Sequence, residues 1–275
     1  MGGGVAAGAF GALLGLGGGV LIIPLLTLGF GLPFREAVGA SLVCVIVTSS
    51  AAASVYLQRD VANLRLGMTL EMFTAVAALA GGLVAFMLPD RMLAVMFALL
   101  LLYVAITMAR SRGARDGSDA DGRRSPDETA PRPSGPEPVG DGGLAALLSR
   151  PDYRVRNLGR GALGSLLAGL VSALFGVGGG IVKVPVMNLI MGVPMRVATA
   201  TSNLMIGVTA SAGALVYLFR GGIDPYVAAP TAVGVFAGAS LASRLAPRVD
   251  LRVLRLLFVA VLILTAAQMA LRGIT

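Results

Sequence analysis

The sequence predicts an all-α, polytopic membrane protein built from two homologous halves, and its composition and an internal repeat are the basis for this prediction. Hydrophobic residues make up 56 % of the 275 residues and charged residues only 13 %, whereas soluble domains carry about 25 % charged residues. Several apolar windows approach the roughly 20 residues that a helix needs to cross the hydrocarbon core. The chain is therefore expected to lie in a lipid bilayer.

A glycine-rich motif that occurs twice marks the repeat. Residues 15–24 read Gly-Leu-Gly-Gly-Gly-Val-Leu-Ile-Ile-Pro, and residues 176–185 read Gly-Val-Gly-Gly-Gly-Ile-Val-Lys-Val-Pro, at an offset of 161 residues. The match continues without a gap, so that about 20 of roughly 45 aligned positions are identical. An internal duplication follows, with transmembrane repeats at 1–110 and 158–275 joined by a linker at 111–157.

The first half begins with an interrupted apolar helix in residues 1–33. Its interruptions are a glycine triplet and Pro24, because glycine weakens a helix and proline removes a backbone hydrogen bond. Two half-helices of roughly twelve residues are expected, and their free backbone groups must be satisfied inside the molecule. Three further helices are expected at 34–57, 68–88 and 92–109.

The second half repeats this plan. An interrupted element is expected at 161–193, followed by helices at 195–219, 226–246 and 250–272. Residues 111–157 are rich in Asp, Arg, Gly, Ser and Pro and poor in core-forming residues, which is typical of a solvated linker.

The placement of the arginines distinguishes parallel from inverted repeats. If each broken element crosses the membrane, the halves are parallel and the cations divide fourteen against seven. If each broken element returns to its own side, the halves are inverted and the division is seventeen against four, with Lys183 inside the membrane. Cytoplasmic loops carry the excess of Lys and Arg. The inverted arrangement with a cytoplasmic linker is favoured, and the parallel one stays open.

Inverted repeats with broken helices are typical of secondary transporters, which bind substrate near the midplane where the repeats meet. The unpaired N–H groups at a half-helix N-terminus carry about half a positive charge, and glycine lets a ligand approach the backbone closely. Two such termini that face one another are expected to bind a small anion. The backbone positions predicted for this site are Gly17, Gly18, Gly19, Gly178, Gly179 and Gly180.

Polar side chains on the next helix of each half are expected to complete the site. Ser41 and Thr48 lie seven residues apart, as do their copies Ser202 and Thr209, so each pair shares a helix face. Asn203 follows Ser202 directly and is a further candidate donor. The alternative is that these groups bond to their own helix backbone or hold helices together.

Lys183 stands where the first repeat has Ile22 and is predicted to bind the anion. A lysine at membrane depth is costly unless it is paired or hydrated. The closest acidic candidate, Glu71, is expected in the first turn of its helix, at the membrane interface. Lys183 is therefore predicted to lack an acidic partner. The alternative is that its side chain snorkels to the interface.

The duplicated Gly-x-Gly-Gly-Gly-x-x-x-x-Pro motif, followed by Gly-x-Pro-x-Arg and a Ser/Thr-rich helix, resembles the sulfite exporter TauE/SafE family. The resemblance covers residues 10–110 and 160–272. It implies a multi-pass permease of the bacterial inner membrane that moves sulfite, sulfonates such as sulfoacetate, or related sulfur oxyanions, usually outward.

Other classes of function are less well supported. The chain has no histidine, and its glycine triplets lack the Gly-Lys-[Ser/Thr] of a Walker loop, so neither an enzyme nor a cofactor or metal is predicted. No nucleic-acid partner is expected, because the arginines cluster at helix ends and in the linker. An anion channel of the same fold and a permease for another small organic anion stay open. Gly234 and Gly238 are compatible with helix packing or a homodimer.

Overall fold

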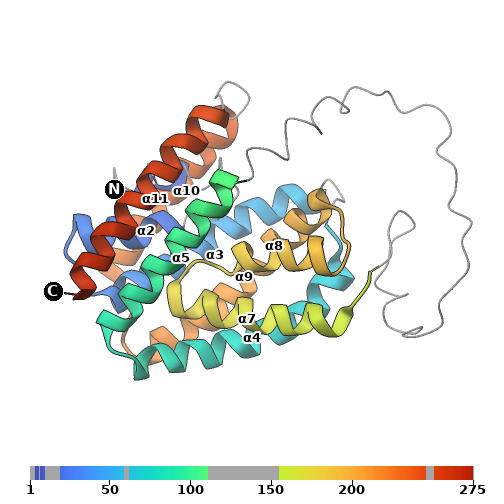
Figure 1. Ribbon diagram of the computed structural model, residues 1–275, viewed down its shortest axis with the longest axis horizontal. Helices are drawn as coiled ribbons and strands as arrows, with labels where there is room; N and C mark the ends of the chain where they lie inside the picture. The colour runs from blue at the N-terminus through green and yellow to red at the C-terminus, as the bar shows by residue number, and fades with distance from the viewer. Residues whose placement is uncertain are drawn as a thin grey trace, which may run out of the picture.

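The protein is helical throughout the residues that its computed structural model describes, namely 4–5, 7–9, 19–58, 62–110, 155–245 and 251–274 (Figure 1). The predicted helices are confirmed, each boundary within four residues of its predicted position. The described helices are α2 (Gly19–Pro24), η1 (Leu25–Gly29), α3 (Phe34–Gln58), α4 (Leu64–Met87), α5 (Asp90–Arg110), α7 (Leu158–Phe175), α8 (Gly180–Pro185), η2 (Val186–Ile190), α9 (Met195–Phe219), α10 (Pro225–Leu245) and α11 (Leu251–Ile274). Most of the predicted linker, residues 111–154, lies outside the described residues.

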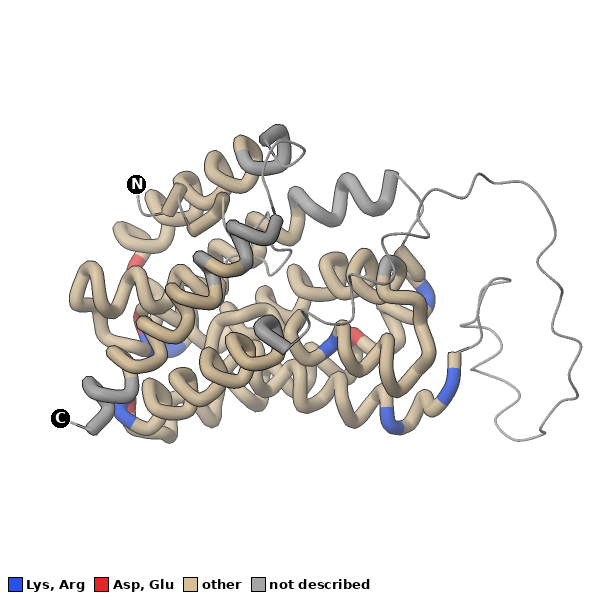
Figure 2. Tube along the Cα trace, turned by 45° about the horizontal axis from the view of Figure 1, so that its top comes forward, with Lys and Arg blue, Asp and Glu red and all other residues tan. Residues whose placement is uncertain are grey.

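Several of these helices have the length and composition of membrane spans. The described residues contain four such segments, Leu64–Met87, Asp90–Thr107, Leu158–Phe175 and Val197–Phe219. Their outward faces are apolar and exposed, for example at Met72 and Val76 on α4 and at Leu163 and Leu167 on α7. Basic residues lie mainly near helix ends (Figure 2). This distribution is the one expected for helices surrounded by lipid.

The glycine motif of the second half breaks the helix as predicted. α7 ends at Phe175, and Gly176, Gly178 and Gly179 adopt φ angles of 60°, 80° and 72° before α8 begins. These left-handed conformations favour glycine because it has no Cβ. The predicted equal half-helices are wrong: α7 has 18 residues, whereas Gly180–Ile190 has only 11. The break therefore follows one full-length helix rather than dividing a single span in the middle.

The chain returns after this break to the end from which it came. The backbone N–H of Arg156, just before α7, donates to the carbonyl of Met191 at 3.0 Å, just after η2. The side-chain amide of Asn157 donates to the carbonyl of Ile190 at 3.3 Å. Residues 158–190 therefore form a helical hairpin whose two ends lie together.

A proline in each half changes the winding of the short helix after the break. Pro24 ends α2 and Pro185 ends α8, and five π-helical residues follow each of them. Proline lacks the backbone N–H that an α-helix needs at this position, and wider turns of this kind re-pair the neighbouring groups. In the second half, the N–H of Met191 reaches back five residues to the carbonyl of Val186 at 3.2 Å. The two halves thus share this irregularity as well as their sequence.

The helices of the two halves pack in pairs that match when the halves are exchanged. α3 packs on its own copy α9, and α5 packs on its own copy α11. α4 packs on α9, just as α10 packs on α3. α4 also lies along α7. On the equivalent face of α10, the backbone of Val235 lies so close to Gly8 that a side chain at Gly8 would not fit. The halves are therefore related by an approximate two-fold operation.

The central pair, α3 and α9, runs antiparallel. A Cβ atom on Gly207 would lie 2.7 Å from the hydroxyl of Ser49, and one on Gly213 would lie 3.5 Å from the side chain of Leu42. Contacting positions therefore have lower residue numbers on α3 as they have higher ones on α9. A helix and its own repeat copy therefore point in opposite directions at the centre of the molecule.

Candidate functional site

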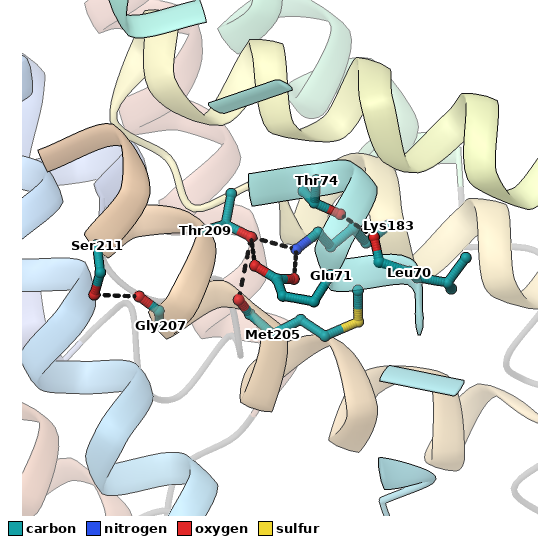
Figure 3. A network of polar contacts seen from close by, with 8 residues as sticks. All are labelled: Leu70, Glu71, Thr74, Lys183, Met205, Gly207, Thr209 and Ser211. Atoms are coloured by element: carbon teal, nitrogen blue, oxygen red, sulfur yellow. Dashed lines mark hydrogen bonds and ion pairs between the residues drawn. The ribbon is translucent and has the colours of Figure 1, made fainter. Parts of the chain in front are cut away.

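Lys183 is buried in the molecule and paired with an acid, so the prediction that it lacks an acidic partner is wrong. Its side chain is only 1 % exposed, and Nζ lies 2.9 Å from Oε2 of Glu71, which is itself buried (Figure 3). The alternative that Lys183 snorkels to the interface is excluded by the same burial. A buried charge pair of this kind requires close geometry and further hydrogen bonds to compensate for the loss of water.

The position of Glu71 was misjudged because α4 begins earlier than predicted. The side chain of Asn63 accepts a hydrogen bond of 3.2 Å from the N–H of Leu66, and this cap starts the helix at Leu64 rather than at residue 68. Glu71 consequently lies about two turns inside α4 instead of in its first turn. Asn63 followed by an apolar run was the sequence signal for this start.

Thr209 on α9 completes a triangle with the ion pair. Lys183 donates to the hydroxyl oxygen of Thr209 at 2.6 Å, and the same hydroxyl lies 2.6 Å from Oε1 of Glu71 and 3.1 Å from the carbonyl of Met205. A hydroxyl has one proton, so Thr209 accepts from the ammonium group and donates to the carboxylate or to the carbonyl. Both carboxylate oxygens of Glu71 thus face donors. The charged groups come from α4 and α8, which belong to different halves.

The repeat-equivalent positions, one in each half, are apolar. The offset of 161 residues relates Lys183 to Ile22 and Ala232 to Glu71. Ile22 and Ala232 are buried in one hydrophobic cluster, and Thr48 donates to the carbonyl groups of Cys44 and Val45 in its own helix. The fold therefore builds the same interface once with an ion pair and once without it.

Gly19 and Gly176, which belong to the glycine motifs of the two halves, both lie beside Ser41. Its hydroxyl is 2.8 Å from the carbonyl of Gly176, in the second break, and 3.4 Å from the carbonyl of Gly19, where α2 begins. A Cβ atom on Gly19 would collide with that Gly176 carbonyl at 2.5 Å. Gly19 and Gly176 thus lie side by side, whereas Gly17 and Gly18 lie outside the described residues. Anion binding by the two glycine motifs stays a prediction.

Two buried hydroxyls beside the second break have no hydrogen-bond partner within the part of the chain that the structure describes. These are Ser172 on α7 and Ser202 on α9. A Cβ atom on Gly180 would lie 3.5 Å from the hydroxyl oxygen of Ser202, and one on Gly179 would lie 3.3 Å from Cβ of Ser172. Gly179 is the N-cap of α8, and its carbonyl accepts from the N–H groups of Val182 and Lys183 at 3.1 and 3.0 Å. Two unpartnered hydroxyls therefore lie near the start of α8.

The remaining predicted residues divide between this region and the helix interior. Gly178 lies in the break, where a Cβ atom would meet Ile206 at 2.7 Å, and Asn203 is buried next to Ser202. Thr48 bonds to its own helix, as in the alternative reading. Sequence reasoning missed Glu71 and Ser172. Within the described ranges, no three His, Cys, Asp or Glu residues come together as a metal site.

Comparisons with known proteins agree on one kind of molecule. A model of the family described as sulfite exporter TauE/SafE matches residues 1–269. The chain is 24 % identical to the "Probable membrane transporter protein YunE" of Bacillus subtilis (strain 168), over 98 % of this chain and 96 % of that protein. It is 27 % identical to the "Probable membrane transporter protein MJ0441" of Methanocaldococcus jannaschii, over 77 % of this chain and 68 % of that protein. No solved structure matches the chain significantly.

Proposed function

Because the chain belongs to the sulfite exporter TauE/SafE family and is a membrane transporter, we propose that it exports small sulfur oxyanions across the bacterial inner membrane. Sulfite and sulfonates are the substrates proposed, and the mechanism is that of a secondary transporter with its site where the two halves meet. The observation that carries the proposal is the pair of buried hydroxyls beside the second break, Ser172 and Ser202, which have no hydrogen-bond partner among the described residues.

The chemistry of this group suits an anion. Hydroxyl and backbone N–H groups are donors, and hydrogen bonds to a charged acceptor are about twice as strong as those between neutral groups. Ser172 and Ser202 are buried with their hydroxyls unpartnered among the described residues, and a bound oxyanion would accept from them. A sulfite or sulfonate group has three oxygens, so one group can accept from both hydroxyls.

Substitution of these hydroxyls tests the site. Ser172→Ala and Ser202→Ala are each expected to weaken sulfite binding by about tenfold, the effect of one lost hydrogen bond to a charged group. Ser211→Ala is the matched control, because the hydroxyl of Ser211 donates to the carbonyl of Gly207 in its own helix at 2.8 Å. A thermal-shift titration of the solubilised protein gives the affinities. Equal affinity in all three variants would remove these hydroxyls from the site.

Reconstitution tests the transport mechanism. Liposomes that contain the purified protein are expected to show saturable counterflow of labelled sulfite, as a carrier does. Ohmic single-channel current carried by the same anion would instead support a channel of the same fold.

We also propose that the two halves are inverted in the membrane, with the linker on the cytoplasmic side. In support, the hairpin at 158–190 returns to its own end, and α3 runs antiparallel to its copy α9. α4 and α9 run the same way, because Gly67 approaches Thr201 near their starts and Gly82 approaches Val216 near their ends. Inverted repeats of this kind with broken helices are common among secondary transporters.

Two exposed arginines distinguish inverted from parallel halves. In the inverted arrangement Arg65 faces the cytoplasm and Arg220 faces outward, whereas parallel halves place both on one side. Arg65→Cys and Arg220→Cys are made in a Cys44→Ala chain, which removes the one native cysteine. A membrane-impermeant maleimide is expected to label the cysteine at position 220 in intact cells and the one at position 65 only after permeabilisation. Labelling of both from outside contradicts the inverted arrangement.

A further inference from the structure

The ion pair between Lys183 and Glu71 is a feature that the fold itself does not require. Its repeat-equivalent pair, Ile22 in the first half and Ala232 in the second, is buried in a hydrophobic cluster. A buried ion pair is often no more stabilising than well-packed apolar residues. Charged residues inside a membrane usually mark a pathway for substrates, ions or protons.

The pair has the geometry of an anion receptor that is occupied by an internal carboxylate. The two oxygens of Glu71 lie 2.9 Å from the ammonium group of Lys183 and 2.6 Å from the hydroxyl of Thr209. A sulfite or sulfonate oxygen presents the same negative charge to the same donors. Lys183 lies three residues beyond Gly180 on one short helix, so an anion at the second break is within about one turn of this receptor.

We propose that Glu71 is a proton-binding group coupled to the substrate. An entering anion replaces the carboxylate of Glu71 on Lys183 and Thr209, and the released carboxylate takes up one proton at Oε2 from the aqueous phase that delivers the anion. Lys183 keeps its proton throughout. This inference rests on the function proposed above and adds to it the coupling ion and the residue that carries it.

The net charge of the site determines how many protons bind with each anion. Without substrate, Lys183 and Glu71 sum to zero, and a monovalent anion alone would leave one uncompensated negative charge. The helices packed around Glu71 supply no other charge at this depth: Arg65 on α4, Arg160 on α7 and Arg196 on α9 all lie in the first turns of their helices. Uncompensated buried charge is strongly unfavourable. One proton per monovalent anion restores neutrality, so anion and proton bind together.

Calorimetry with the full-length, solubilised protein and methanesulfonate tests this coupling, because methanesulfonate keeps a single charge across the working pH range. In buffers with different ionisation enthalpies, binding is expected to consume about one proton per anion, and affinity is expected to fall about tenfold for each pH unit of increase. Glu71→Gln is expected to bind with little pH dependence and without proton uptake. Glu36→Gln is the control, since Glu36 lies in the first turn of α3, and it is expected to keep the proton uptake.

A double variant separates this role from a structural one. Lys183→Ile combined with Glu71→Ala copies the repeat-equivalent residues Ile22 and Ala232, so it is expected to fold with a melting temperature near that of the native protein but to lose methanesulfonate binding. Native affinity in this folded variant would overturn the inference. Methanesulfonate binding to the native protein without proton uptake would also overturn it, and would leave the proposed export of sulfur oxyanions standing. Absence of any sulfite or sulfonate binding by the native protein would overturn both.

Discussion

Ser41 donates a 2.8 Å hydrogen bond to the carbonyl of Gly176, a residue 135 positions further along the chain. This bond joins α3 of the first half to the glycine break of the second half. The repeat copy of Ser41, Ser202, is equally buried, but its hydroxyl has no partner among the described residues. The junction between the halves is therefore asymmetric, although the packing of their helices is nearly symmetric.

The first prediction concerns the bond between the breaks. Ser41→Ala removes the donor and leaves the buried carbonyl of Gly176 without this partner, which is expected to destabilise the protein by about 1–2 kcal/mol. Thermal unfolding in detergent measures the change. Ser50→Ala is the control, because that exposed hydroxyl bonds only to the carbonyl of Ile46 in its own helix. Equal melting temperatures for both variants would show that the bond from Ser41 to Gly176 contributes nothing to stability.

The repeat itself explains why so much of the fold could be predicted. The periodicity and the length of the apolar segments predicted each helix, and the glycine triplet with its proline predicted the second break. The π-helical turns could not be predicted, because they depend on how the groups freed by Pro24 and Pro185 find new partners in three dimensions. The unequal lengths of the helices before and after the break could not be predicted for a similar reason. They depend on contacts between α7 and the returning chain, where Gly161 and Gly164 make room for the side chains of Met191 and Val186.

The second prediction concerns the stability of the ion pair. Glu71→Ala leaves the ammonium group of Lys183 buried without its counter-ion and is expected to destabilise the protein by about 3–5 kcal/mol. Adding Lys183→Ile to Glu71→Ala removes the uncompensated charge, so most of this loss is expected to be recovered. Melting temperatures of the two single variants and the double variant complete the cycle. Simple additivity of the two changes would contradict a direct interaction between the residues.

Glu71 also shows where sequence reasoning reaches its limit. Its depth in the membrane depended on the start of α4, and a shift of four residues moves a side chain by about one turn. Its partner, Lys183, lies 112 residues away on a helix of the other half. The spacing of residues within one repeat therefore gives no information about this contact between the halves. The sequence does show that each charge has an apolar residue as its repeat copy, Ala232 for Glu71 and Ile22 for Lys183, and this shared asymmetry was the available signal.

The third prediction concerns the left-handed glycine that precedes α8. Gly179→Ala forces a side chain into a backbone with φ of 72° and brings its Cβ atom 2.9 Å from the carbonyl of Ala168. The conformational strain alone is expected to cost about 1–2 kcal/mol. Gly159→Ala is the matched control, since no atom lies within 4 Å of a Cβ atom there and the residue is in the first turn of α7. It is expected to be neutral or stabilising by up to about 1 kcal/mol, and thermal unfolding compares the two.

The fourth prediction concerns the hydroxyl between the two charged residues. Thr209→Val keeps the shape of the side chain but removes the group that accepts from Lys183 at 2.6 Å and contacts Glu71 at 2.6 Å. Each lost hydrogen bond to a charged group is worth about 1.5–3 kcal/mol. Initial rates of sulfite counterflow in liposomes are therefore expected to fall by tenfold or more. Thr74→Val is the control, because the buried hydroxyl of Thr74 donates to the carbonyl of Leu70 within α4 at 2.8 Å and does not join the triangle (Figure 3). Thr74→Val is expected to keep a counterflow rate close to the native one. If Thr209→Val does so as well, the triangle has no part in transport, and the ion pair is then only a structural contact between α4 and α8.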